Sequence, residues 1–99
     1  MDSGAIGVGI IGLGTVGSGV VRLLEDAPIS MRRREHAVFS IERVAVRDLA
    51  KERDVEIDPS KLTDDPTAVL DDPKVQLVVE LTGAEPAYEW VRGALERGK

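Results

Sequence analysis

Residues 5–17 read Ala-Ile-Gly-Val-Gly-Ile-Ile-Gly-Leu-Gly-Thr-Val-Gly, an apolar run that passes directly into three closely spaced glycines. The run over residues 5–11 is short and rich in β-branched side chains, which is typical of a strand buried on both faces of a parallel sheet. Further apolar residues recur at the spacing i, i+4, i+7, i+8 of one helix face: Val16, Val20, Leu23 and Leu24. Pro28 ends this helix, so the predicted order is strand, glycine turn, helix.

The glycines at positions 12, 14 and 17 match the pattern G-x-G-x-x-G between a predicted strand and a predicted helix. In that context the first glycine permits a tight turn, the second lets the backbone approach a pyrophosphate, and the third allows close packing of helix and strand. The helix N-terminus adds free N–H groups and a partial positive charge. The alternative is a tight turn without a ligand. We favour cofactor binding, and the predicted pyrophosphate-binding residues are Gly12, Leu13, Gly14, Thr15, Val16 and Gly17.

A second strand is predicted after a polar surface excursion over residues 29–40. Its apolar positions are Ile41, Val44 and Val46. The strand ends at Arg47 and Asp48, and Asp48 can cap a short helix that extends to about Arg53.

The second half of the chain repeats the alternation of strands and helices. Leu62 and Thr63 form at best a two-residue edge strand, and Asp65 and Pro66 begin a short helix as its N-cap and first residue. Residues 75–81 form the next apolar strand. A last helix begins at Pro86, ends at Gly98 and has apolar residues at helical spacing: Ala87, Val91, Ala94 and Leu95.

This alternation predicts the α/β class, with a Rossmann-like open parallel sheet and flanking helices. A doubly wound dinucleotide-binding domain has about six strands, and this chain supplies at most four of them. We therefore expect one domain over residues 1–99, with a sheet that is incomplete at its C-terminal side.

Two strand ends carry the remaining candidate binding residues. A strand-end arginine such as Arg47 can bind the 2′-phosphate of NADP, whereas an acidic residue such as Asp48 can hydrogen-bond the ribose 2′-hydroxyl of NAD. Arg47 therefore favours NADP, whereas Asp48 is compatible with NAD. The alternative interpretation of Arg47 is a solvated charge at the strand end that binds no cofactor. Thr82 and Gly83 either border the nicotinamide half or simply make a turn, and Glu80 is interpreted as a hydrogen-bonded strand-end carboxylate.

Composition and charge exclude several classes of function. The net charge of -5 disfavours non-specific binding to nucleic acid or anionic membranes. The apolar runs are too short to span a bilayer and the N-terminus lacks a basic signal region, so a cytoplasmic location is expected. Without cysteine there is no thiolate nucleophile, and redox chemistry must come from a cofactor. No metal site is predicted, because the acidic pairs at residues 64–65 and 71–72 precede prolines and indicate caps and turns.

Four stretches taken together resemble the N-terminal part of homoserine dehydrogenases: VGIIGLGTVGSGVV at 8–21, VAVRD at 44–48, LTDDP at 62–66 and DDPKVQLVVELTG at 71–83. Residues 85–89 and 94–99 are similar to the helix that follows in that family. The resemblance implies oxidation of L-homoserine to L-aspartate-4-semialdehyde, or its reverse, with NAD or NADP, on the route to threonine and methionine. It also implies that the glycine loop holds the pyrophosphate, that Arg47 meets the adenosine ribose or its phosphate, and that Thr82 and Gly83 lie near the nicotinamide.

The resemblance places the family's catalytic residues beyond Lys99. A Thr-Ala-Asn-Lys stretch after the next strand, and an Asp and a Lys of a substrate domain, have no counterpart in residues 1–99. We therefore predict no catalytic residue here, and a chain that binds NADP or NAD without turning over substrate. The strand over residues 75–79 would be an exposed edge, which favours a homodimer. The alternative function is a stand-alone nucleotide-sensing module.

Overall fold

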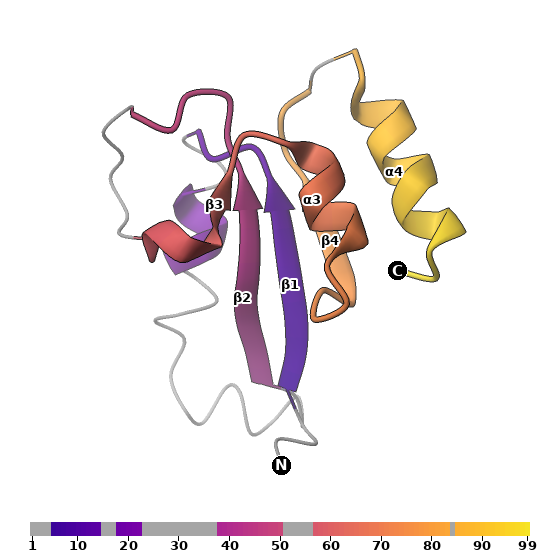
Figure 1. Ribbon diagram of the computed structural model, residues 1–99, viewed down its shortest axis with the longest axis horizontal. Helices are drawn as coiled ribbons and strands as arrows, with labels where there is room; N and C mark the ends of the chain where they lie inside the picture. Colours follow the sequence, from indigo (N-terminus) through magenta and orange to yellow (C-terminus); the bar gives the residue numbers. More distant parts are fainter. Residues whose placement is uncertain (1–4, 15–17, 23–37, 51–56, 84) are drawn as a thin grey trace.

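The computed structural model describes residues 5–14, 18–22, 38–50, 57–83 and 85–99. Its elements are β1 (Ala5–Ile11), β2 (Val38–Ala45), the 3-10 helix η1 (Pro59–Lys61), β3 (Leu62–Thr63), α3 (Pro66–Asp71), β4 (Leu77–Glu80) and α4 (Ala87–Glu96). Residues 18–22 are also helical. The strands pair in parallel in the order β3-β2-β1-β4 (Figure 1). The predicted open, parallel α/β sheet is confirmed.

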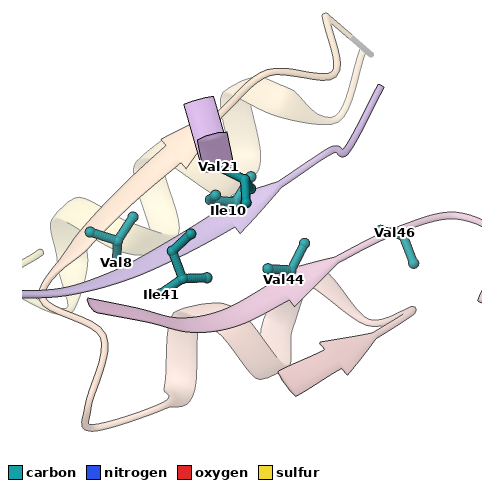
Figure 2. Close-up of a cluster of buried hydrophobic side chains, with 6 residues drawn as sticks. All are labelled: Val8, Ile10, Val21, Ile41, Val44 and Val46. Atoms are coloured by element: carbon teal, nitrogen blue, oxygen red, sulfur yellow. The ribbon is translucent and has the colours of Figure 1, made fainter. Parts of the chain in front are cut away.

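The central strand β1 sends successive side chains into two different cores. One core lies between the sheet and the helical residues 18–22, and Figure 2 shows its buried members: Val8, Ile10, Val21, Ile41, Val44 and Val46. The other lies on the opposite face, beneath α3 and α4: Ile11, Ala45, Val69, Leu70, Val75 and Ala94. Because helices cover both faces, β1 needs apolar residues at consecutive positions, as its sequence predicts.

The register between β1 and β2 shifts by one residue in the middle of the pair. Val8 pairs with Ile41, whereas the next residue of β1 pairs with Arg43. The extra residue, Glu42, forms a bulge in β2. The bulge lets Ile41 and Val44, three positions apart, bury their side chains in the same core.

Glycine in β1 lets α3 pack directly on the strand backbone. A Cβ atom on Gly9 would lie 2.5 Å from Cγ1 of Val69 and 2.9 Å from Cγ1 of Val75. Glycine also allows α3 and α4 to approach each other closely on this face. A Cβ on Gly93 of α4 would lie 2.9 Å from Cδ1 of Leu70 in α3. The close packing of this face therefore requires glycine, which has no side chain, at positions 9 and 93.

Local signals set the ends of the helices as predicted. The side chain of Asp65 accepts a hydrogen bond from the N–H of Thr67 at 2.9 Å, and Pro66 is the first residue of α3. Pro86 precedes α4, and Gly98 follows it with a φ of 78°. Leu62–Thr63 is the two-residue edge strand that the sequence predicts.

Both boundaries of β2 and both boundaries of β4 differ from the sequence prediction. β2 begins at Val38, within the predicted excursion, because residues 38–40 pair with residues 5–7 of β1. It ends at Ala45, before Arg47. β4 is Leu77–Glu80 rather than 75–81. Val75 is buried in the core before the strand begins. The side chain of Gln76 accepts a hydrogen bond from the N–H of Gly7, so the regular pairing of β4 with β1 begins at Leu77.

Several predicted features lie outside the described residues. They are the helix positions Val16, Leu23, Leu24 and Pro28, the excursion over 29–37, and the end of the short helix near Arg53. Residues 49–50 form a turn, in which the side chain of Asp48 accepts a hydrogen bond from the N–H of Ala50 at 3.0 Å. In the described ranges, no helix has the length and apolar character needed to cross a membrane.

Candidate dinucleotide-binding site

The order of the strands creates a switch point between β1 and β4. From β1 the chain continues to β2 and β3 on one side of the sheet, and then returns to place β4 on the other side of β1 (Figure 1). Connections that leave neighbouring strand ends in opposite directions open a crevice at the carboxyl edge of the sheet, where open α/β proteins bind their ligands. The candidate residues follow the ends of β1, β2 and β4, and thus surround this point.

Gly12 begins the loop after β1 in a conformation that favours glycine. Its φ is 100°, and a Cβ atom at this position would lie 2.7 Å from Cγ2 of Thr82. Its N–H donates a hydrogen bond to the carbonyl oxygen of Ala45 at 2.9 Å. The first glycine of the motif is therefore needed both for the turn and for the close approach of the segment after β4.

Gly14 is exposed, and among the described residues other than its chain neighbours no atom lies within 4 Å of a Cβ atom built on it. The fold itself thus has room for a side chain at this position. The carbonyl oxygen of Gly14 accepts a hydrogen bond from the N–H of Ser18 at 2.9 Å, which ties the helical residues 18–22 to the loop. A bare backbone beside a helix N-terminus fits a pyrophosphate group.

The remaining residues of the glycine loop divide into described and undescribed ones. Leu13 is half-buried and packs against the core that contains Val21, so it anchors the loop to the body of the domain. Thr15, Val16 and Gly17 lie outside the described residues.

The segment after β4 lies beside the glycine loop. The N–H of Leu81 donates to the carbonyl oxygen of Ile11 at 2.9 Å, which continues the β1–β4 pairing past the strand end. The next residue, Thr82, reaches Gly12, and Gly83 turns the chain with a φ of 64°. The structure therefore brings Thr82 together with the first glycine of the motif, 70 positions earlier in the chain.

Arg47 and Asp48 follow β2, on the other side of β1 from Thr82. Both are exposed, and Arg47 makes no ion pair with another residue of the described ranges. The hydrogen bond between Gly12 and Ala45 connects the glycine loop to the end of β2. Ala45 is two residues before Arg47 in the chain. Arg47 and Thr82 thus follow strands on opposite sides of β1.

Three of the four aspartates in the two Asp-Asp-Pro stretches, at residues 64–66 and 71–73, have structural roles. Asp65 caps α3, Asp71 pairs with Arg97 at 2.7 Å, and Asp72 pairs with Arg43 at 3.3 Å. The predicted use of the acidic pairs in caps and turns is confirmed for Asp65 and Asp72, whose side chain also accepts from the N–H of Lys74 at 2.8 Å. Among the described residues, no group of three or more His, Asp or Glu side chains could hold a metal ion.

One contact of this site was only partly predictable. The sequence indicates a hydrogen-bonded carboxylate at Glu80, and the structure identifies the partner as Thr82, through both its N–H and its hydroxyl group. An acidic residue two positions before a threonine at a strand end is the sequence signal for this contact. Nothing local indicates that Thr82 then lies against Gly12.

Comparisons with known proteins agree with this geometry. A family model described as "Homoserine dehydrogenase, NAD binding domain" matches residues 12–99. The homoserine dehydrogenase of Bacillus subtilis is 38% identical over 96 residues, which cover 96% of this chain and 22% of the relative. That of Synechocystis is 39% identical over 93 residues, which cover 93% of this chain and 21% of the relative.

Solved structures give the same result. The chain matches a homoserine dehydrogenase of S. aureus with a TM-score of 0.84 and 34% identity, over 96% of this chain and 25% of that one. It matches one from Thiobacillus denitrificans with a TM-score of 0.80 and 38% identity, over 96% and 22%. The chain thus spans a quarter or less of the length of these relatives. Because the family model matches 12–99, the chain belongs to the family of NAD-binding domains of homoserine dehydrogenases.

Proposed function

We propose that residues 1–99 form the cofactor-binding portion of a homoserine dehydrogenase, which interconverts L-homoserine and L-aspartate-4-semialdehyde. The observation that carries this proposal is the glycine loop at the β1–β4 switch point, with Gly12 at a positive φ and Gly14 open to the crevice. The nicotinamide dinucleotide would supply the hydride-transfer chemistry. The role of this chain is to bind and orient it.

Each candidate residue has a proposed role in holding the dinucleotide. The pyrophosphate is assigned to Gly12, Leu13, Gly14, Thr15, Val16 and Gly17, where backbone N–H groups and the helix N-terminus favour an anion. Arg47 is assigned to the adenosine half, because the first mononucleotide unit of such a domain contains β1, β2 and β3. Thr82 and Gly83 are assigned to the nicotinamide half, because β4 begins the second unit.

We further propose that the site prefers NADP to NAD. Asp48 uses one carboxylate oxygen to accept from Ala50, within the turn that follows β2. Arg47 is exposed at the same strand end, and a guanidinium can bind a phosphate through two parallel hydrogen bonds. These two observations favour recognition of a 2′-phosphate by Arg47.

Calorimetric titration with NADPH and NADH tests both proposals. The wild type should bind NADPH more tightly, and Arg47→Ala should lose this preference while its NADH affinity changes little. Arg92→Ala is the matched control, because Arg92 lies on α4 and pairs only at the surface with Glu96. Equal or NADH-favoured binding by the wild type would assign selectivity to Asp48. A folded chain that binds neither nucleotide would overturn the proposed function.

The proposed protein partner is a second copy of the chain, at the free edge of β4. Within the described residues β4 pairs with β1 alone, and Leu77 is 43% exposed. Pairing of two such edges around a two-fold axis would satisfy their backbone groups. Sedimentation velocity should detect a dimer that Leu77→Lys weakens, whereas Leu49→Lys, at an exposed position after β2, should not. A wild type that stays monomeric at all concentrations would contradict this assembly.

A further inference from the structure

We propose that Glu80 is a positioning residue for the nicotinamide half of the site: its carboxylate fixes Thr82 and so shapes the wall that faces the glycine loop. This inference rests on the proposed binding of a dinucleotide. It assigns to Glu80 neither proton transfer nor direct contact with substrate.

The contact between Glu80 and Thr82 fixes two parts of the same residue. One carboxylate oxygen, Oε2, accepts a hydrogen bond from the N–H of Thr82 at 2.9 Å and another from its hydroxyl group. The first bond holds the backbone of the segment after β4, and the second holds the side-chain rotamer. Hydrogen bonds to an ionised carboxylate are roughly twice as strong as neutral ones, so this arrangement restrains Thr82 strongly.

The restrained side chain lies at the switch point. Glu80 is the last residue of β4 and pairs in register with Ile11, the last residue of β1. With its hydroxyl turned toward Glu80, Thr82 has its methyl carbon Cγ2 close to Gly12, 2.7 Å from where a Cβ on that glycine would lie. The carboxylate thereby sets the position of the β4 segment against the first residue of the pyrophosphate loop.

A general-base role fits the geometry less well. The same oxygen already accepts two hydrogen bonds from Thr82, so its lone pairs are directed at protein donors rather than at a substrate hydroxyl group. Glu80 is half-buried, whereas Thr82 is exposed at the edge of the crevice. The arrangement is that of a supporting group behind a contact residue.

The test compares binding of the whole dinucleotide with binding of its adenosine half. Glu80→Ala should weaken NADPH binding about tenfold, the change expected when a hydrogen bond to a charged group is lost. The same variant should bind 2′-phospho-ADP-ribose, which lacks nicotinamide, as tightly as the wild type. The fluorescence of bound NADPH should also shift toward that of the free nucleotide, because the nicotinamide would be less well held.

Three further variants separate positioning from a general loss of structure. Glu80→Gln keeps an acceptor oxygen and should restore most of the affinity. Thr82→Val keeps the shape of Thr82 but lacks the hydroxyl, and should reproduce part of the defect even if Glu80→Ala fails to fold. Glu85→Ala removes an exposed carboxylate nearby and should have no effect.

Each unfavourable outcome has a distinct meaning. Equal loss of NADPH and 2′-phospho-ADP-ribose binding would make Glu80 a structural residue and overturn the inference. Unchanged NADPH binding by both Glu80→Ala and Thr82→Val would also overturn it. A folded wild type that binds neither compound would overturn the proposed function and this inference with it.

Discussion

The N–H of Gly12 donates a hydrogen bond to the carbonyl oxygen of Ala45 at 2.9 Å, which ties the glycine loop to the end of the neighbouring strand β2. The same glycine lies against Thr82, at the end of the strand on the other side. Gly12 is therefore the point at which the three strand ends of the proposed site are held together, and its replacement should affect fold and binding at once.

Gly12→Ala should lower the free energy of unfolding by about 1–3 kcal/mol, because alanine is strained at a φ of 100° and its Cβ would meet Thr82. Urea denaturation measures this change. The control is Gly19→Ala, at an exposed helical position where a Cβ meets no described residue within 4 Å outside its own stretch of helix. That variant should be more stable than the wild type by about 0.5–1 kcal/mol. Similar destabilisation of both variants would contradict this account of Gly12.

Gly14→Ala should separate ligand binding from folding. A Cβ at this position meets no atom within 4 Å in the part of the chain that the structure describes, apart from its chain neighbours. The free energy of unfolding should therefore change by less than about 0.5 kcal/mol. The added methyl group would stand where the pyrophosphate is proposed to approach, and NADPH binding should weaken about tenfold or more. Thermal melts without nucleotide and calorimetric titrations give the two quantities. Unchanged binding would mean that the pyrophosphate does not contact this part of the loop.

Asp65→Ala should destabilise the chain by about 1 kcal/mol, because the N–H of Thr67 would lose its acceptor at the start of α3. Urea denaturation of this variant is compared with that of Asp64→Ala, which removes the same charge from an exposed position that does not cap the helix. An equal effect of the two substitutions would assign the loss to charge rather than to the cap.

Asp58 should make stability depend on acidic pH. The N–H of Ser60, its hydroxyl group and the nearby charge of Lys61 hold the pKa of Asp58 below its ordinary value of 3.8. A carboxyl group with a lowered pKa stabilises the folded state above 3.8, and this contribution is lost as the pH falls through the folded-state pKa. An NMR titration should give a midpoint below 3.8 for this carboxyl group. Asp58→Asn should remove its share of the acid-induced loss of stability, whereas an ordinary midpoint would rule out the contribution.

The elements with strong local signals were predictable with their ends. The run of apolar residues between glycines predicts β1 as Ala5–Ile11, and an aspartate followed by proline predicts the start of α3 at Pro66. The boundaries of β2 and β4 were not predictable in the same way. Pairing with β1 extends β2 back to Val38, and the side chain of Gln76 delays the start of β4 to Leu77. Strand ends depend on a partner strand, which a local pattern does not contain.

The class of fold, the glycine loop and the membership of the homoserine dehydrogenase NAD-binding domains could all be read from residues 1–99 alone, because each depends on short local patterns and on their order along the chain. Three contacts became visible only in the folded chain: Thr82 lies against Gly12, α3 packs on the bare backbone of Gly9, and Ile41 and Val44 share a core through a bulge. Those contacts follow from the placement of β4 beside β1 and from the register of β1 with β2. Hydrogen bonding and close packing between segments far apart in the chain determine this placement and this register. Such long-range contacts leave no periodic signal in the sequence.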